Sequence, residues 1–174
     1  GEMLQSLLSV SRLGPANLES SIALEAVQSQ IEAARGMEFD EILASFNADG
    51  SDDPDGPGTA VGTGFSIPGF DTTPGDADAL VGRVELPLLG GQLREDMVFP
   101  ELGLPRDLNG DGIIDALDHS TDCVLIPMRV SVDWQSRKGP RTVTLTTIIV
   151  PFMDPDTTGS TGFVDPSITH GGAP

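Results

Sequence analysis

The segment DLNGDGIIDALD, residues 107–118, constrains this chain more than any other stretch. Side chains that carry oxygen recur at its positions 1, 3, 5, 9 and 12, and a glycine stands at position 6. The calcium loop of an EF-hand has this pattern, because Ca²⁺ takes about six to eight oxygen ligands and the loop needs a sharp turn. The pattern predicts a Ca²⁺ site made of these residues: Asp107, Asn109, Asp111, Ile113 (through its carbonyl), Asp115 and Asp118.

The last ligand position sets this loop apart from an EF-hand. Position 12 is Asp118 and not the bidentate glutamate, so the loop resembles those of dockerin modules, which carry two loops where this chain has one. We expect Ile114, at position 8, to anchor the loop to a core, and calcium to stabilise a fold and not to signal. The alternative is an acidic turn without metal, since Asp, Asn and Gly dominate turns.

The composition excludes one class of partner. The 174 residues fit one domain, and the formal net charge of −18 argues against binding nucleic acid, because contact with phosphates needs a basic surface. The acidic balance fits a secreted or cell-surface protein. No run of about 18 apolar residues occurs in the sequence, as a transmembrane segment would require.

The single cysteine, Cys123, allows no intrachain disulfide, and we expect a buried, unreactive thiol.

Apolar residues at helical spacing predict a helix over residues 3–46. Gly14-Pro15 should break or kink it, since proline removes a backbone donor. In its second half one face carries Ile22, Ala23, Ala26, Val27, Gln30, Ile31 and Ala34, and the pattern continues through Phe39, Ile42, Leu43 and Phe46. We expect this second half to pack on the protein's own sheet; the alternative for the apolar stripe is a partner helix in an assembly.

Residues 47–79 are rich in Gly, Pro, Asp and Thr, and they predict a long loop pinned to the core by a few apolar side chains. The loop also carries an acidic group: Asp49, Asp52, Asp53 and Asp55. These residues lack the spacing of ligands, so a solvated acidic run is favoured over a second ion site.

Two hairpins are predicted in the rest of the chain. The first consists of Leu80–Leu89, a turn at Gly90-Gly91 and a possible partner strand at Leu93–Phe99. The second has a strand with one buried face, formed by Val124, Ile126, Met128, Val130, Val132 and Trp134, and a return strand over residues 143–149. Pro127 implies an edge or a bulge near the strand start.

The connection Gln135–Arg141 of the second hairpin gathers three basic side chains, Arg137, Lys138 and Arg141. They form either a solvated turn or a docking point for an acidic neighbour.

A search for a catalytic site finds little. His119 follows the metal loop and is expected at the surface, and His170 lies in a C-terminal tail, residues 154–174, which we expect to be loosely ordered. The sequence contains no nucleophile elbow, no zinc-protease helix motif and no phosphate-binding loop. We therefore predict that the chain is not an enzyme.

Two segments resemble type IV pilins and the pseudopilins of type II secretion systems. The first is SSIALEAVQSQIEAARGMEFDEIL (Ser20–Leu43), which is similar to a pilin helix that is rich in Ala and ends A-x-x-x-x-E-x-x-R-x-x-x-F. The second is MRVSVDWQSRKGPRTVTLTTIIV (Met128–Val150), which is similar to the V-x-V-x-W hairpin and L-x-T strand of I-type minor pseudopilins. Together they cover somewhat under half of the chain.

The resemblance implies an α+β fold in three parts. A long amphipathic N-terminal helix (residues 1–46) would pack on the antiparallel β-sheet of a head (residues 47–153), followed by the tail (residues 154–174). The head would carry the long Gly/Pro-rich loop and the calcium loop. Calcium loops stabilise the heads of pseudopilins, although a dockerin-like loop departs from their usual site.

The resemblance also implies a location and partners. A leader cleaved by a prepilin peptidase and a membrane-spanning helical segment would precede Gly1, anchoring the protein in the inner membrane before assembly. The protein would then join a filament in the periplasm or at the cell surface, and its N-terminal helix would bind other pilin or pseudopilin subunits. It would serve as a structural subunit, a minor pilin or pseudopilin.

A second hypothesis is a calcium-dependent extracellular binding or adhesion module, which the acidic loop and the many Gly, Pro and Thr residues support. The sequence encoded ahead of Gly1 distinguishes the two hypotheses. A G-F-T-x-x-E motif followed by about 20 apolar residues favours the filament subunit, and a conventional secretory signal favours the binding module.

Overall fold

The computed structural model describes residues 2–151, and in the first helix it describes side chains from Asn17 onward. The predicted tail, residues 154–174 with His170, therefore lies outside the described residues. The side chains of the first part of the predicted helix, before Asn17, lie outside them as well.

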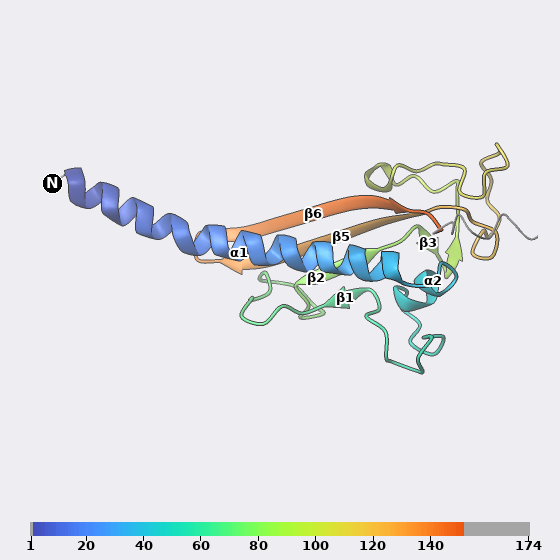
Figure 1. The fold of residues 1–174 in the computed structure, drawn as a ribbon, viewed down its shortest axis with the longest axis horizontal. Helices are drawn as coiled ribbons and strands as arrows, with labels where there is room; N and C mark the ends of the chain where they lie inside the picture. Colours follow the sequence, from blue (N-terminus) through green and yellow to red (C-terminus); the bar gives the residue numbers. More distant parts are fainter. Residues whose placement is uncertain (1, 152–174) are drawn as a thin grey trace, which may run out of the picture.

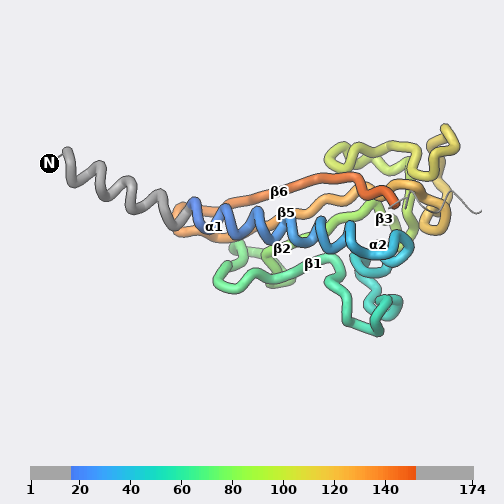
Figure 2. The backbone as a smooth tube through the Cα atoms, in the orientation of Figure 1, coloured from blue at the N-terminus to red at the C-terminus, as the bar shows by residue number. Residues whose placement is uncertain are grey.

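One long helix lies along an antiparallel sheet (Figures 1 and 2). The helix is α1 (Glu2–Gly36), and the sheet has the strand order β1-β2-β5-β6, with β1 at Gly64–Phe65, β2 at Gly82–Glu85, β5 at Ile126–Ser136 and β6 at Gly139–Ile149. The predicted α+β class, with a long helix on an antiparallel sheet, is confirmed. Among the described helices, none combines the length and the apolar character that a membrane crossing demands.

The helix predicted over residues 3–46 is in fact two helices. α1 ends at Gly36, and a short helix, α2 (Glu41–Ser45), follows a turn in which the Glu41 amide donates to the Glu38 carbonyl. Glycine has the lowest helix propensity after proline, which explains the end of α1 at this residue. The Gly14-Pro15 pair lies inside α1, and the kink expected there stays a prediction.

The face that α1 turns to the sheet is narrower than predicted. Ala23, Val27, Ile31 and Ala34 are buried at helical spacing against β5 and β6. Ile22, which the sequence placed on this face, is instead exposed. The small alanines let the helix backbone approach the sheet closely.

β5 is the central strand of the packed core. Its alternate residues Ile126, Met128, Val130, Val132 and Trp134 are all buried, as predicted. Val124 was expected to belong to this face, but it lies before the strand begins and is exposed.

Pro127 is tolerated because of where β2 ends. The last β2–β5 pair is Glu85 with Arg129, so at Pro127 the side of β5 that faces β2 has no pairing partner. This part of β5 therefore behaves as an edge, as the proline implied.

The connection between β5 and β6 is shorter than the predicted Gln135–Arg141. Pairing continues to Ser136 opposite Gly139, so only Arg137 and Lys138 form the turn, and Arg141 belongs to β6. The turn end of the hairpin contacts the protein's own helix, because the Trp134 indole N–H donates to the Glu19 carboxylate over 3.2 Å.

A second, smaller core lies beyond the sheet. The segment Leu80–Leu89 is divided between β2 and β3 (Leu88–Leu89), and β3 pairs with β4 (Gln92–Leu93) through the predicted turn at Gly90-Gly91. The partner strand expected over Leu93–Phe99 ends at Leu93, because the chain then turns toward a short 3₁₀ helix, η1 (Pro100–Leu102). The residues buried in this core are Leu93, Leu102, Leu104 and Leu108.

The contact between Glu19 and the hairpin generates a test. Hydrogen bonds from Ser136 and Trp134 outweigh the effect of burial and, with the charges of Arg141 and Arg137, hold the pKa of Glu19 below its ordinary value. A lowered folded-state pKa means that the contact stabilises the protein above the carboxyl pKa of the unfolded chain, about 4.3, and that this stability is lost as the pH falls through the folded-state value.

We expect Glu19→Gln to lower the free energy of unfolding at pH 7 by no more than about 1 kcal/mol, because the site is partly open to solvent. The difference between variant and wild type should shrink below about pH 4. Urea denaturation across this pH range measures both, with Glu25→Gln, on an exposed position of α1, as the matched control. A Glu19→Gln difference that stays constant from pH 7 to pH 3 would contradict the assignment.

Candidate metal centre

In the loop at residues 107–118, backbone amides donate hydrogen bonds to the loop's own acidic side chains. Asp107 accepts hydrogen bonds from two backbone amides, with 2.6 Å from Oδ1 to the Gly110 nitrogen and 2.8 Å from Oδ2 to the Gly112 nitrogen. Both glycines have positive φ, 79° and 84°, a conformation that other residues adopt only with strain. The glycine predicted for a sharp turn at position 6, Gly112, thus lies at such a turn.

The next predicted ligands repeat the same local contact. Asn109 Oδ1 accepts from the Asp111 amide over 3.1 Å, and Asp111 Oδ1 accepts from the Ile113 amide over 2.7 Å. In each of these side chains, one oxygen accepts a hydrogen bond from the backbone amide two residues further along the loop.

The end of the loop is fastened to β4. Asp118 Oδ1 accepts from the Leu93 amide and from the Ser120 amide, each over 3.1 Å. The position that would be glutamate in an EF-hand is thus a shorter side chain that joins the loop to the sheet of β3 and β4.

The apolar anchor of the loop differs from the prediction. Ile114 at position 8 is 49% exposed, whereas Leu108 at position 2 is fully buried in the second core. Leu108 points inward because its amide donates to the buried Glu95 carboxylate, which fixes the start of the loop against the core.

The Glu95 carboxylate accepts hydrogen bonds from the loop on the side that faces the second core. Its side chain is fully buried, with 0% of the residue exposed. Oε1 accepts from the amides of Leu108 and Asn109, over 2.5 and 3.2 Å, and Oε2 accepts from the Asp115 amide over 3.3 Å. These charge-assisted bonds replace the water that the carboxylate gives up on burial.

His119 was expected at the surface, but it is only 4% exposed. Its ring lies between acidic side chains: Nδ1 is 3.0 Å from Asp122 Oδ1, and Nε2 is 3.1 Å from Asp115 Oδ1 and 3.8 Å from Glu95 Oε2. The ring is drawn inward because these carboxylates engage both of its nitrogens.

Three of these side chains converge on one point. Glu95, Asp115 and His119 each offer a ligand atom within 4.8 Å of the others, and such a group can hold a metal ion. Of the six residues predicted as ligands, Asp115 belongs to this group. The side chains of Asp107, Asn109 and Asp111 are held by amides within the loop, and that of Asp118 by the amides of Leu93 and Ser120. Ile113 contributes only its backbone carbonyl to the predicted set.

The electrostatics of the group reflect its charges. Burial acts to lower the pKa of His119, but the hydrogen bonds of Asp115 and Asp122 and the charge of Glu95 outweigh it, so the pKa is raised. The pKa of Asp115 is lowered, mainly by the Leu117 amide and then by His119.

Sequence reasoning missed Glu95, although a signal for it was present. In the strand predicted over Leu93–Phe99, Glu95 falls on the same face as Leu93, Met97 and Phe99. A charge at an inward position needs a buried partner, and that partner is the loop at residues 107–118.

Cys123 lies close to this centre and is partly buried. Burial raises the pKa of its thiol to about 11. The thiol is therefore protonated at neutral pH and a poor nucleophile, which agrees with the unreactive thiol expected from the sequence.

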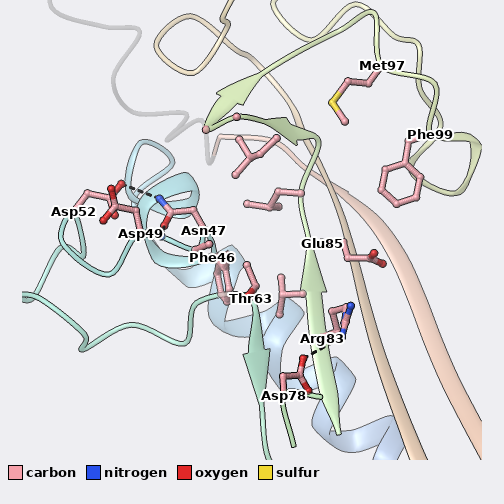
Figure 3. A pocket seen from close by; sticks show the side chains of 16 residues that line it. Phe46, Asn47, Asp49, Asp52, Thr63, Asp78, Arg83, Glu85, Met97 and Phe99 are labelled. Atoms are coloured by element: carbon pink, nitrogen blue, oxygen red, sulfur yellow. Dashed lines mark hydrogen bonds and ion pairs between the residues drawn. The ribbon is translucent and has the colours of Figure 1, made fainter. Parts of the chain in front are cut away.

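The other acidic loop lines a separate groove (Figure 3). Asn47, Asp49 and Asp52 lie at one side, Met97 and Phe99 at the other, and the cavity volume is about 830 Å³. The acidic side chains are again engaged locally, with Asn47 donating to Asp52 over 2.8 Å and Asp49 accepting from the Ser51 amide over 3.0 Å.

Comparison with protein-family models, with characterised proteins and with solved structures finds no match to this chain.

We predict that Glu95→Ala destabilises the head by about 2–4 kcal/mol, because it removes the acceptor of the buried Leu108 amide and of the partly buried amides of Asn109 and Asp115. Urea denaturation at pH 7 measures the loss. Glu101→Ala, at an exposed position of η1, is the control and should change the free energy of unfolding by no more than about 0.5 kcal/mol. Equal stability of the two variants would show that the carboxylate does not support the loop.

Proposed function

We propose that this chain is a structural subunit of a filament, a minor pilin or pseudopilin of a type IV pilus or a type II secretion pseudopilus. The observation that carries the proposal is the arrangement of α1. Residues 23–34 bury one face on the antiparallel sheet, while Leu18, Ile22 and Leu24 leave apolar surface exposed on the same helix.

The position of the hairpin turn supports the same proposal. Trp134, at the turn end of β5, contacts Glu19, and α1 begins further toward the N-terminus, at Glu2. A helix that packs on its own head through one face and exposes Leu18, Ile22 and Leu24 suits assembly, because these side chains can pack against the helices of neighbouring subunits.

Calcium is the ion that we propose for the loop at residues 107–118. The loop supplies oxygen ligands at the spacing of a calcium loop, and hard cations such as Ca²⁺ prefer oxygen. The loop is also tied to the second core through Leu108 and Glu95, so an ion bound there would stabilise the head. Outside the cell, millimolar calcium fills such weak sites.

A calcium-dependent binding module is the alternative, and one observation favours it. Ile113, Ile114 and Leu117 are large apolar side chains of the loop, and all three are exposed. Apolar groups presented by a metal loop are suited to contact a partner, whether a ligand or a neighbouring subunit.

Removal of calcium tests the role of the ion. In protein already freed of transition metals, a calcium chelator should lower the melting temperature by a few degrees, since a site filled about tenfold above its dissociation constant stabilises by about 1.4 kcal/mol. Added Ca²⁺ should restore the wild-type value. Asp111→Ala should abolish the response, and the control Asp49→Ala, in the other acidic loop, should retain it. An unchanged melting curve in excess chelator would count against a structural calcium ion.

Crosslinking in living cells tests the filament role. In the full-length protein of the native organism, with Cys123 replaced by Ala, Leu18→Cys should crosslink to a second filament subunit through a bifunctional thiol reagent. Val98→Cys is the control, because Val98 is also apolar and highly exposed but lies on the head, 84% exposed against 63% for Leu18. Crosslinks at neither position, or at Val98 alone, would contradict packing through the helix.

A further inference from the structure

The geometry of Glu95, Asp115 and His119 points to a second cation site, distinct from the oxygen-only calcium loop. We propose that these three side chains bind a divalent transition metal ion of the Zn²⁺ class. This inference does not depend on the filament role or on calcium in the loop.

The donor set decides the class of metal. Ca²⁺ and Mg²⁺ prefer ligands that are all oxygen, whereas an imidazole nitrogen suits Zn²⁺ and its first-row neighbours. His119 presents Nε2 to the two carboxylates, so the three donors are one nitrogen and two oxygens. Three protein ligands and a water in the fourth position make a common zinc site.

The distances between the donors suit a tetrahedral ion. Bonds of about 2.0–2.2 Å to zinc place two ligands roughly 3.3–3.6 Å apart. His119 Nε2 lies 3.1 Å from Asp115 Oδ1 and 3.8 Å from Glu95 Oε2, so shifts of a few tenths of an ångström would seat an ion between them.

The other nitrogen of the same ring has the partner that a metal ligand needs. Metal-binding histidines usually donate their second ring N–H to a carboxylate, which fixes the tautomer and the ring orientation. His119 Nδ1 lies 3.0 Å from Asp122 Oδ1. With the proton on Nδ1, the Nε2 lone pair points at Asp115 and Glu95, and either a second proton on Nε2 or a metal cation would remove the repulsion.

The charge at this point also calls for a cation. Glu95 is fully buried, and its partners besides His119 are neutral backbone amides. Arg94 acts on Asp115, but its guanidinium is held by Asp96, with 2.6 Å from Nη2 to Oδ2. A divalent ion would neutralise the two carboxylates and, on binding, displace any proton from Nε2.

The two cations can share Asp115. In an EF-hand loop position 9 often reaches the calcium through a water molecule, so Asp115 can bind the transition metal directly while it contacts Ca²⁺ indirectly. Occupation of one site therefore does not exclude the other.

The experiment is a Co²⁺ titration of the full chain, freed of metal by chelation and kept in saturating Ca²⁺. Wild type should bind one Co²⁺ with the visible absorption of a tetrahedral N,O site, and Zn²⁺ should displace it. His119→Gln should weaken binding at least about 100-fold, whereas Asp122→Ala should weaken it about 10–100-fold. The control His170→Gln changes the other histidine and should bind as wild type does.

Asp111→Ala separates this site from the calcium loop, because it should keep the Co²⁺ spectrum after the calcium response is lost. The proposal is overturned if wild type takes up no Co²⁺ or Zn²⁺, which would make His119 an imidazolium held by its acidic neighbours. It is also overturned if Asp111→Ala and His119→Gln remove Co²⁺ equally, because the ion would then sit in the loop. Since the decisive titration uses the wild-type chain, a variant that fails to fold does not decide the outcome.

Discussion

The buried face of β5 is the constraint on which the rest of the head depends. Five alternate side chains, from Ile126 to Trp134, contribute to one core that α1 covers from above and β2 and β6 extend on either side. The strand can be buried in this way because every second residue points to the same face. The small residues Ala23 and Ala34 then bring the helix close enough to exclude water.

The second constraint is a buried charge. Glu95 follows the β3–β4 hairpin and connects it to the loop at residues 107–118, through the amides of Leu108, Asn109 and Asp115. A carboxylate without water must find donors, so the loop cannot move away from the second core without leaving the charge unpaired. The loop at residues 107–118 therefore covers one side of the second core and is also a surface turn.

In the proposed filament subunit, the two constraints act on different parts of the head. The first core holds α1 on the head, while Leu18, Ile22 and Leu24 of the same helix stay exposed. The second core supports the loop at residues 107–118, and the buried His119 follows this loop directly, so the two proposed cation sites adjoin the same core. An ion in either proposed site would join residues that already lie in contact, so neither proposal requires a conformational change.

The sequence by itself determined what local pattern can encode. The alternation in residues 126–134 predicted β5 with its buried face, the helical spacing of Ala23 to Ala34 predicted a helix on a sheet, and the D-x-N-x-D-G segment predicted a tight loop rich in oxygen ligands. Only the tertiary structure decided which distant residues meet. Glu95, Leu108 and His119 are far apart in the sequence, and the periods of a strand (2) or a helix (3.6) relate only residues that are close together in it. Their convergence therefore depends on how β4, the loop and the second core pack. For the same reason Leu108, and not Ile114, became the anchor: side chains are buried where the fold places the core, and local spacing alone does not specify that place.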